Sequence, residues 1–268
     1  MPSFLLISLL AGFVASQSNG VAYRARVKGL SIAVGPGNGL SPGSRGSDTA
    51  FLTTQDGSVF KIQGSTGQVV NQYTPDVTGV CTTMVDWNDA SYESKGIGAY
   101  AIGNVIIILD SDGNKFDSFT ITKGNVTSQP IAHADLVYVA SNSGNSGFLS
   151  IYDPYQTNPI PKLFFRESWT GVKIGPIAKG EHGIYFGTSF GQVAFVDTAS
   201  RFEPGSVAFA TSSTGEDMRG LPFVDDSSLV MLSPQGTLYG WSVVEGSAGS
   251  SLFEIPLGSD SFGKPSAG

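Results

Sequence analysis

Short apolar runs of four to six residues recur along the chain, separated by polar turns rich in Gly, Asp, Ser and Asn. The stretch 181–197, EHGIYFGTSFGQVAFVD, shows the arrangement: residues 184–186 and 193–196 are apolar, and 187–191 lie between them. Runs of this length, interrupted by turn residues, are typical of β-strands joined by hairpins. The pattern therefore predicts an all-β chain made of short strands.

Glycines that precede an apolar strand recur at a fixed interval. They are Gly57, Gly103, Gly147, Gly191 and Gly236, at spacings of 46, 44, 44 and 45 residues. A constant period of this length indicates a repeat architecture in which each copy is one small structural unit. The hairpin at 181–197 is therefore one copy of five.

Two further residue types repeat with the same period. The aromatics are Tyr73, Phe119, Phe165, Phe209 and Phe253, at spacings of 46, 46, 44 and 44 residues. The prolines are Pro42, Pro130, Pro176, Pro222 and Pro265, at spacings of 88, 46, 46 and 43 residues, and the first gap equals two periods. Three registers with one period support the repeat independently of one another.

Each copy reads as a proline-led segment, an apolar run, the glycine-led strand, a polar turn and a final strand that carries the aromatic. Four strands in about 45 residues make one blade of a β-propeller. A blade cannot bury both of its faces alone, so neighbouring blades must stack. We therefore predict an all-β propeller of four-stranded blades over residues 40–268, with five recognisable repeats and a partial sixth that starts at Pro265. The residues predicted to form the core between blades are Ile62, Ile108, Tyr152, Val196 and Trp241.

The detail of the repeat carries a family resemblance. Residues 53–70, TTQDGSVFKIQGSTGQVV, resemble the repeat of the pyrroloquinoline-quinone-type propellers, in which an Asp-Gly turn and a Thr-Gly turn flank a strand. Weaker likeness extends over residues 42–257. The tryptophan that commonly follows the Thr-Gly turn is absent after Gly67, and Tyr73 and Phe119 are expected to replace its packing. The chain thus resembles a divergent member of the quinoprotein superfamily, an architecture shared by enzymes and inert scaffolds.

The two ends of the chain carry separate expectations. Residues 1–16, MPSFLLISLLAGFVAS, have the short apolar run and small-residue end of a secretory signal peptide. Residues 17–39 form an N-terminal segment, within which residues 21–35 are one candidate for strands that close the ring. The alternative, which we favour because quinoproteins usually have more than six blades, is that the chain is a fragment of a longer propeller.

Composition limits the compartment and the partners. A leader predicts a protein that is secreted or lies in the lumen of the secretory pathway, or in the periplasm of a bacterium. The net charge of −7 without a basic cluster argues against nucleic acid as a partner. No later apolar run is long enough to cross a membrane. Because Cys81 is the single cysteine, an internal disulfide cannot form.

Residues suited to chemistry are few. A quinone-dependent dehydrogenase, the enzyme that the resemblance implies, needs a calcium site, a catalytic aspartate and, often, adjacent cysteines, and no such set stands out. Residues 110–114, DSDGN, alternate oxygen ligands as calcium loops do, but an Asp-Gly hairpin turn explains them without a metal. His133 and His182 are expected in surface turns. We therefore predict no catalytic residue, no metal and no cofactor, and an enzyme remains the less favoured alternative.

The loops that lead into each repeat proline differ most between copies. They are residues 84–96, 167–173 and 215–220, and they are expected to gather at one rim of the propeller. The candidate binding residues in them are Trp87, Trp169, Met218 and Arg219, which are types that serve as interface anchors. In the alternative interpretation, both tryptophans fold back onto blade edges.

The function predicted from these loops is that of a non-enzymatic scaffold that binds a protein or peptide. A carbohydrate-binding propeller is a further alternative, but it needs an aromatic and polar pair in every blade, and Trp87 and Trp169 lack counterparts in the other copies. The sequon Asn125-Val126-Thr127 predicts a glycan on Asn125 if the source is eukaryotic.

Overall fold

The computed structural model describes residues 40–42, 48–79, 81, 85–87, 97–155, 163–180, 183–197, 207–211, 215–220, 222–225, 227–243 and 250–257. All regular secondary structure in these residues is β-strand, which confirms the all-β prediction. The chain divides into two compact units, unit 1 (Met1–Thr120) and unit 2 (Ile121–Gly268). The predicted signal peptide (1–16), the N-terminal segment (17–39) and the start of a sixth copy at Pro265 lie outside the described residues.

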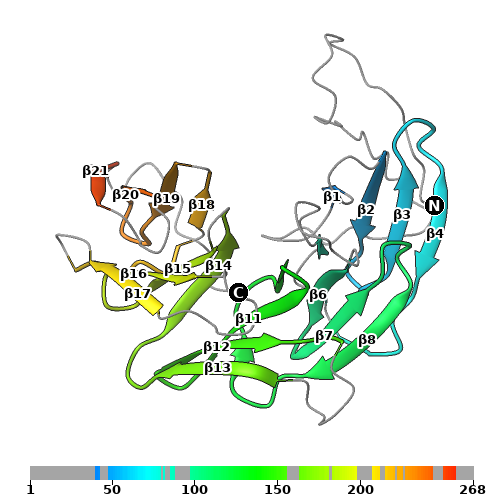
Figure 1. The fold of residues 1–268 in the computed structure, drawn as a ribbon, viewed down its shortest axis with the longest axis horizontal. Coiled ribbons are helices and arrows are strands. Elements are labelled where there is room, and N and C mark those ends of the chain that lie inside the picture. Colours follow the sequence, from blue (N-terminus) through cyan, green and yellow to red (C-terminus); the bar gives the residue numbers. More distant parts are fainter. Residues whose placement is uncertain are drawn as a thin grey trace, which may run out of the picture. The chain divides into compact units, whose positions relative to one another are not determined.

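The described residues of unit 1 form two antiparallel sheets, in each of which the strands follow one another in sequence order (Figure 1). The first consists of β1 (Leu40–Pro42), β2 (Thr49–Thr53), β3 (Val59–Gln63) and β4 (Val69–Tyr73). The second consists of β5 (Asp86–Trp87), β6 (Gly98–Ile102), β7 (Val105–Leu109) and β8 (Lys115–Thr120).

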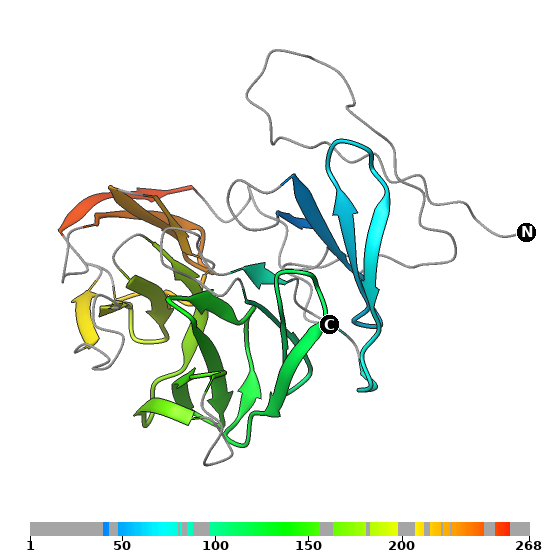
Figure 2. The same cartoon turned by 45° about the vertical axis from the view of Figure 1, so that its right-hand side comes forward.

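In the part of unit 2 that the structure describes, the strands form three antiparallel sheets of the same kind (Figure 2). The first consists of β10 (Ile131–His133), β11 (Leu136–Ser143), β12 (Ser146–Tyr152) and β13 (Leu163–Trp169), with the short strand β9 (Asn125–Val126) paired to β11. The second consists of β14 (Ile174–Lys179), β15 (Gly183–Thr188), β16 (Gln192–Asp197) and β17 (Val207–Thr211). The third, here called the last sheet, consists of β18 (Pro222–Val224), β19 (Ser228–Leu232), β20 (Thr237–Ser242) and β21 (Ser251–Pro256).

The glycine register has a conformational cause. Gly57, Gly103, Gly191 and Gly236 all have a positive φ, between +56° and +89°, in the turn that precedes the third strand of a sheet. A residue without a Cβ adopts this conformation at little cost. Gly147 is the exception, because it lies inside β12, and the turn before that strand takes its positive φ at Gly144.

The residues predicted to form the core between blades are buried. Ile62, Ile108, Tyr152, Val196 and Trp241 each expose 1% or less of their surface. Burying one large apolar side chain completely contributes roughly 1.5–3 kcal/mol. These positions therefore account for a substantial part of the stability of each unit.

The middle sheet of unit 2, β14–β17, is buried on both faces because side chains alternate along its strands. Ile184 and Phe186 of β15 pack with residues of β10–β13. Tyr185 of β15 and Phe195 of β16 pack with residues of the last sheet. The three sheets of unit 2 therefore stack face to face in chain order.

Backbone hydrogen bonds fix how the chain passes from one sheet to the next. In unit 1, the amide of Cys81 donates to the carbonyl of Gln55, in the turn between β2 and β3, over 2.9 Å. In unit 2, the amide of Met218 donates to the carbonyl of Thr188, at the end of β15, also over 2.9 Å. The segment that leads to a new sheet is thus fastened to the second strand, or the turn after it, of the preceding sheet.

The expected surface position is wrong for His133. This residue ends β10, and only 2% of its surface is exposed. It directly precedes the two-residue turn Ala134-Asp135, in which both residues have a positive φ, of 49° and 59°. Positive φ at both central residues is the geometry of a two-residue hairpin turn. Ala134 and Asp135 expose only 8% and 5% of their surface, so the end of this hairpin is itself buried, and His133 with it. His182 lies outside the described residues.

A search of the described residues for a helix long and apolar enough to span a bilayer finds none.

Candidate binding surface

Two of the four predicted binding residues have buried side chains. Trp87 exposes 7% of its surface, and its ring centroid lies 4.2 Å from that of Phe51 across the two sheets of unit 1. Gly98 makes room for it, because a Cβ there would lie 2.8 Å from the indole. Met218 is fully buried in the cluster that joins the last sheet to its neighbour. Both side chains therefore contribute packing, as the alternative interpretation of Trp87 expects.

The other two predicted residues, Trp169 and Arg219, keep part of their side chains exposed. Trp169 ends β13, and its ring centroid lies 5.5 Å from that of Phe186 at a tilt of 53°. One face of the indole therefore packs on the core between sheets while the residue stays half-buried. The side chain of Arg219 exposes 35% of its surface.

Hydrogen bonds and close backbone contact bring three loops of unit 2 together into one surface. The amide of Lys173 donates to Ser189 Oγ over 3.0 Å, and the amide of Ser189 donates back to the carbonyl of Lys173 over 2.9 Å. A Cβ added at Gly191 would lie 2.6 Å from the backbone of Gly215, so the second and third loops touch. We call residues 169–173, 189–191 and 215–219 the rim surface.

An ion pair between Arg219 and Asp217 lies on the rim surface. Arg219 Nε donates to both carboxylate oxygens of Asp217, over 2.9 and 3.0 Å, and Arg219 Nη2 donates to Asp217 Oδ2. Burial alone would raise the pKa of Asp217, but the hydrogen bonds from Arg219 and the charge of Lys173 outweigh it and hold that pKa below its ordinary value. The pair is therefore ionised at neutral pH.

A second carboxylate attaches the third loop of the rim surface to the last sheet. Glu216 accepts hydrogen bonds from Ser233 Oγ over 3.0 Å and from Thr237 Oγ1 over 3.5 Å. Ser233 and Thr237 flank the turn between β19 and β20. This loop is consequently held from both sides, by Thr188 of one sheet and by Ser233 and Thr237 of the next.

Sequence reasoning missed Phe190, the most exposed aromatic on this surface. It lies in the turn between β15 and β16 and exposes 60% of its surface. Thr188 Oγ1 accepts hydrogen bonds from the amides of Phe190 and Gln192, both over 3.3 Å, which holds the turn in shape. An aromatic residue between Ser189 and Gly191, inside the predicted turn at residues 187–191, was the available signal.

The sequon residue Asn125 lies in β9 and is exposed, as is Thr127. The amide of Thr127 donates to the carbonyl of Ala140 over 3.1 Å, which fastens the segment to β11. Glycosylation of Asn125 stays a prediction.

The loop with calcium-like spacing is a hairpin turn between β7 and β8. Asp110 Oδ1 accepts hydrogen bonds from the amides of Asp112 and Asn114, both over 2.9 Å, and Gly113 takes a φ of 85°. The Asp110 carboxylate is thus used to shape the turn, which confirms the predicted Asp-Gly hairpin. Within the described part of the chain, no group of three or more His, Cys, Asp or Glu residues is placed to hold one metal ion.

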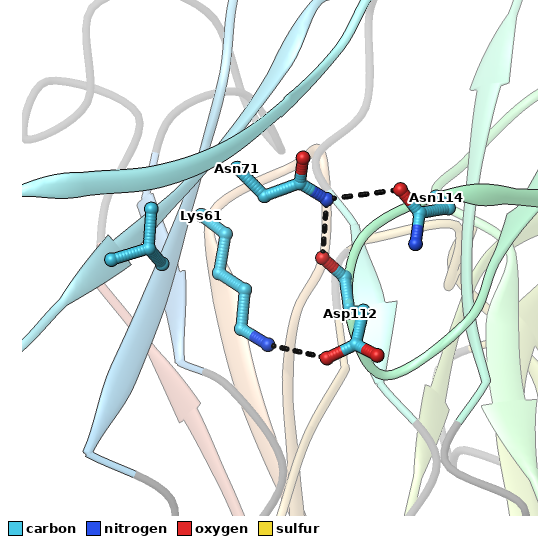
Figure 3. A pocket seen from close by; sticks show the side chains of 5 residues that line it. Lys61, Asn71, Asp112 and Asn114 are labelled. Atoms are coloured by element: carbon cyan, nitrogen blue, oxygen red, sulfur yellow. Dashed lines mark hydrogen bonds and ion pairs between the residues drawn. The ribbon is translucent and has the colours of Figure 1, made fainter.

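This turn docks on the other sheet of unit 1 beside a shallow surface pocket of about 420 Å³ (Figure 3). Lys61 Nζ donates to the carbonyl of Ser111 over 3.0 Å and to Asp112 Oδ1 over 3.1 Å. Asn71 Nδ2 donates to the carbonyl of Asp112 over 2.7 Å and to Asn114 Oδ1 over 3.1 Å. The polar groups that line the pocket therefore form hydrogen bonds and an ion pair with one another, and these interactions connect the two sheets of unit 1.

Comparison with known proteins places the fold. No protein-family model and no curated protein sequence matches the chain. Three of the solved structures that match are BamB from Moraxella catarrhalis, quinohemoprotein alcohol dehydrogenase from Comamonas testosteroni, and the β-propeller domain of Cps50 (Swd1) from Myceliophteria thermophila. Their TM-scores are 0.54, 0.55 and 0.54, and their sequence identities are 18%, 11% and 12%.

The extent of each match differs between the chains compared. The matches cover 81%, 78% and 84% of this chain, in the same order, and they span 64%, 42% and 74% of the other chains. At these identities the likeness concerns the fold alone. The fold is that of a β-propeller, which is the architecture that the resemblance in the repeat implies.

Proposed function

We propose that this protein is a non-enzymatic β-propeller that binds a protein or peptide partner at the rim surface of unit 2. In this proposal the propeller consists of four-stranded blades, five of them recognisable between residues 40 and 257, and the predicted leader directs the chain to a secreted or luminal location. The fold does not decide the function, because it is shared with an alcohol dehydrogenase and with proteins whose names state no reaction. The binding function is therefore inferred from the rim surface itself.

The observation that carries the proposal is the rigid frame beneath exposed aromatic and charged side chains. Three loops of unit 2 are joined through backbone groups, and from them project Phe190, which is 60% exposed, the half-buried Trp169, and the Arg219–Asp217 pair. Large aromatic side chains supply contact area at low entropic cost, and an arginine held by a carboxylate offers its remaining N–H groups in a fixed direction. Loops held on a rigid scaffold commonly form binding sites.

Site-specific photocrosslinking tests the proposal. A benzophenone amino acid at position 190 in the full chain should capture one defined protein from the native source, and the same label at Phe116 should not. Phe116 is a matched control because it is also an exposed aromatic, at 45%, but lies on β8 of unit 1.

A double variant links the capture to the predicted residues. Trp169→Ala combined with Arg219→Ala should abolish the crosslink from position 190. Because backbone hydrogen bonds hold the loops, the melting temperature should fall by only a few degrees, corresponding to roughly 1–2 kcal/mol. Unchanged capture places the binding surface elsewhere. A much larger loss of stability makes the two side chains structural.

The alternative enzyme has a direct test. Purified protein supplied with pyrroloquinoline quinone and Ca²⁺ should show neither dye-linked oxidation of alcohols nor a thermal shift. Reproducible turnover contradicts a purely binding function.

A further inference from the structure

Arg219 presents an open hydrogen-bonding edge on the rim surface. Asp217 occupies one edge of the guanidinium, where Nε and one N–H of Nη2 donate to its carboxylate. The N–H groups left over are those of Nη1 and the second one of Nη2, which lie along another edge of the planar group. Within the described residues, no acceptor binds this open edge. A carboxylate fits such an edge with two parallel hydrogen bonds.

Asp217 fixes the direction in which the open edge faces. Its carboxylate also accepts a hydrogen bond from the backbone amide of Arg219 over 3.0 Å, which ties the pair to the loop. The backbone of Arg219 is closely packed in turn, because a Cβ added at Gly175 of β14 would lie 2.8 Å from Arg219 Cα. The side chain of Asp217 exposes 19% of its surface and that of Arg219 exposes 35%. The guanidinium is therefore the more accessible member of the pair.

A second cation lies beside this pair. Lys173 is close enough for its charge to act on the carboxyl of Asp217. In the described part of the chain, Lys173 Nζ forms neither a hydrogen bond nor an ion pair. Lys173 and Arg219 thus carry one positive charge more than Asp217 balances. Glu216, the other acid of this loop, accepts hydrogen bonds from hydroxyl groups of the β19–β20 hairpin.

Thr188 holds an exposed aromatic residue near this cationic site. Its carbonyl accepts a hydrogen bond from the amide of Met218, the residue before Arg219, over 2.9 Å. Its Oγ1 accepts one from the amide of Phe190 over 3.3 Å. Phe190 and the Arg219 loop are therefore fastened to the same residue, and Phe190 exposes 60% of its surface. A fixed arginine edge and a nearby aromatic suit a ligand that carries a carboxylate and an apolar group together.

We infer that the rim surface binds an acidic peptide segment in which a Glu or Asp stands next to a large apolar residue, an inference that rests on the proposed function. The peptide carboxylate accepts hydrogen bonds from Nη1 and Nη2 of Arg219, and the apolar side chain packs on Phe190. A neutral segment that covered Arg219 would bury its open N–H groups without a charged acceptor, which is unfavourable. A long polyanion is disfavoured by the net charge of −7 and by Glu216 in the same loop.

Selection from a library of random peptides displayed on phage, with the full chain as bait, tests this inference. The enriched peptides should carry Glu or Asp next to a large apolar residue. A synthetic copy of the most enriched peptide should lose at least about tenfold in affinity when its acid is replaced by the corresponding amide. Its affinity should also fall as the salt concentration rises.

Two variants assign the effect to Arg219. Arg219→Lys keeps the charge opposite Asp217 but removes the planar fork, so it should weaken binding of the same peptide at least about tenfold. Lys115→Ala is the matched control and should leave binding unchanged, because Lys115 has a similarly exposed side chain, at 31%, and also pairs with an acid, but lies on β8 of unit 1. If Arg219→Lys folds poorly, the amide-substituted peptide still tests the same contact on the wild type.

Three results overturn the inference. Enriched peptides without an acidic residue, or no enriched peptide at all, show that the rim surface does not select this chemistry. A peptide whose affinity survives both its own amide substitution and Arg219→Lys binds elsewhere. Displacement of the peptide by inorganic phosphate at the same concentration shows an unselective anion site.

The proposed function and this inference can fail separately. A protein captured from position 190 when no acidic peptide is enriched supports the binding function and refutes the acidic partner. Acidic peptides that depend on Arg219 when position 190 captures no protein refute the binding function of the native chain alone.

Discussion

Asn142 offers the sharpest test of how the sheets of unit 2 are joined. Its side-chain amide forms the same pair of hydrogen bonds that the backbone of a neighbouring strand would form. Asn142 Nδ2 donates to the carbonyl of Ile174 over 2.8 Å, and Asn142 Oδ1 accepts from the amide of Ile174 over 3.0 Å. Ile174 begins the next sheet and exposes 1% of its surface. One side chain therefore satisfies both backbone groups of a buried residue in the neighbouring sheet.

The cost of Asn142→Ala follows from these two bonds. Each hydrogen bond contributes about 0.5–1.5 kcal/mol, and each buried backbone group left without a partner adds a desolvation penalty of about 1–3 kcal/mol. Because water can reach part of this site, we expect a total loss of about 3 kcal/mol in the free energy of unfolding. Asn142→Asp should cost at least as much, because a carboxylate oxygen then faces the carbonyl of Ile174.

Urea unfolding followed by tryptophan fluorescence measures this loss, since Trp169 and Trp241 report on unit 2 and Trp87 reports on unit 1. The matched control is Asn71→Ala in unit 1, which also removes two hydrogen bonds between sheets, but at an exposed position. Its partners become solvated when the amide is removed, so the loss should stay below about 1 kcal/mol. If Asn142→Ala costs no more than Asn71→Ala, the amide of Asn142 does not join the sheets as described.

Three further predictions concern the backbone and the rim surface. Gly187→Ala should destabilise the protein by about 2–3 kcal/mol in a thermal melt, because the added Cβ would lie 1.7 Å from the carbonyl oxygen of Met218. A neutral effect would contradict that close packing. Ala134→Gly should raise the free energy of unfolding by about 0.5 kcal/mol. Glycine relieves a left-handed φ that costs alanine about 1–2 kcal/mol, and this gain exceeds the cost of the larger conformational entropy of the unfolded chain. A lower free energy of unfolding would show that the φ of Ala134 is not strained. Asp217 has a lowered pKa in the folded state, so its carboxylate adds stability that is fully present above the unfolded pKa near 3.8 and is lost as pH falls through the folded pKa. In an acid titration, the higher stability of wild type relative to Asp217→Asn should therefore vanish well below pH 4. A stability difference that persists there would refute the role of the Arg219 pair.

The positions of the strands could be predicted because the signals are local. A glycine with positive φ, a polar turn and an apolar run all lie within about ten residues, and the repeat multiplies each signal. Tyr152 and Trp241 could be identified as core for the same reason, since they occupy corresponding places in different copies. The predicted turn at residues 110–114 likewise depended on adjacent residues only.

Contacts between sheets were not predictable in this way. Lys61 binds the carbonyl of Ser111, fifty positions along the chain, and nothing near either residue signals the other. Trp87 and Met218 have the composition of interface anchors, and only the packing of the neighbouring sheet buries them. Phe190 was missed for a different reason: it lies in the predicted turn at residues 187–191, whereas the predicted binding residues came only from the loops that lead into a repeat proline.

The rim surface separates the requirements of folding from those of binding. Its loops are held mainly by backbone groups, such as the amide of Met218 on the carbonyl of Thr188 and the amide of Ser189 on that of Lys173. These bonds do not depend on which side chains project outward. Phe190 and Arg219 can therefore change with little effect on the sheets, whereas Asn142 and Gly187 cannot. Under the proposed function, a fold built in this way keeps its sheets fixed while the exposed residues of its loops adapt to a partner.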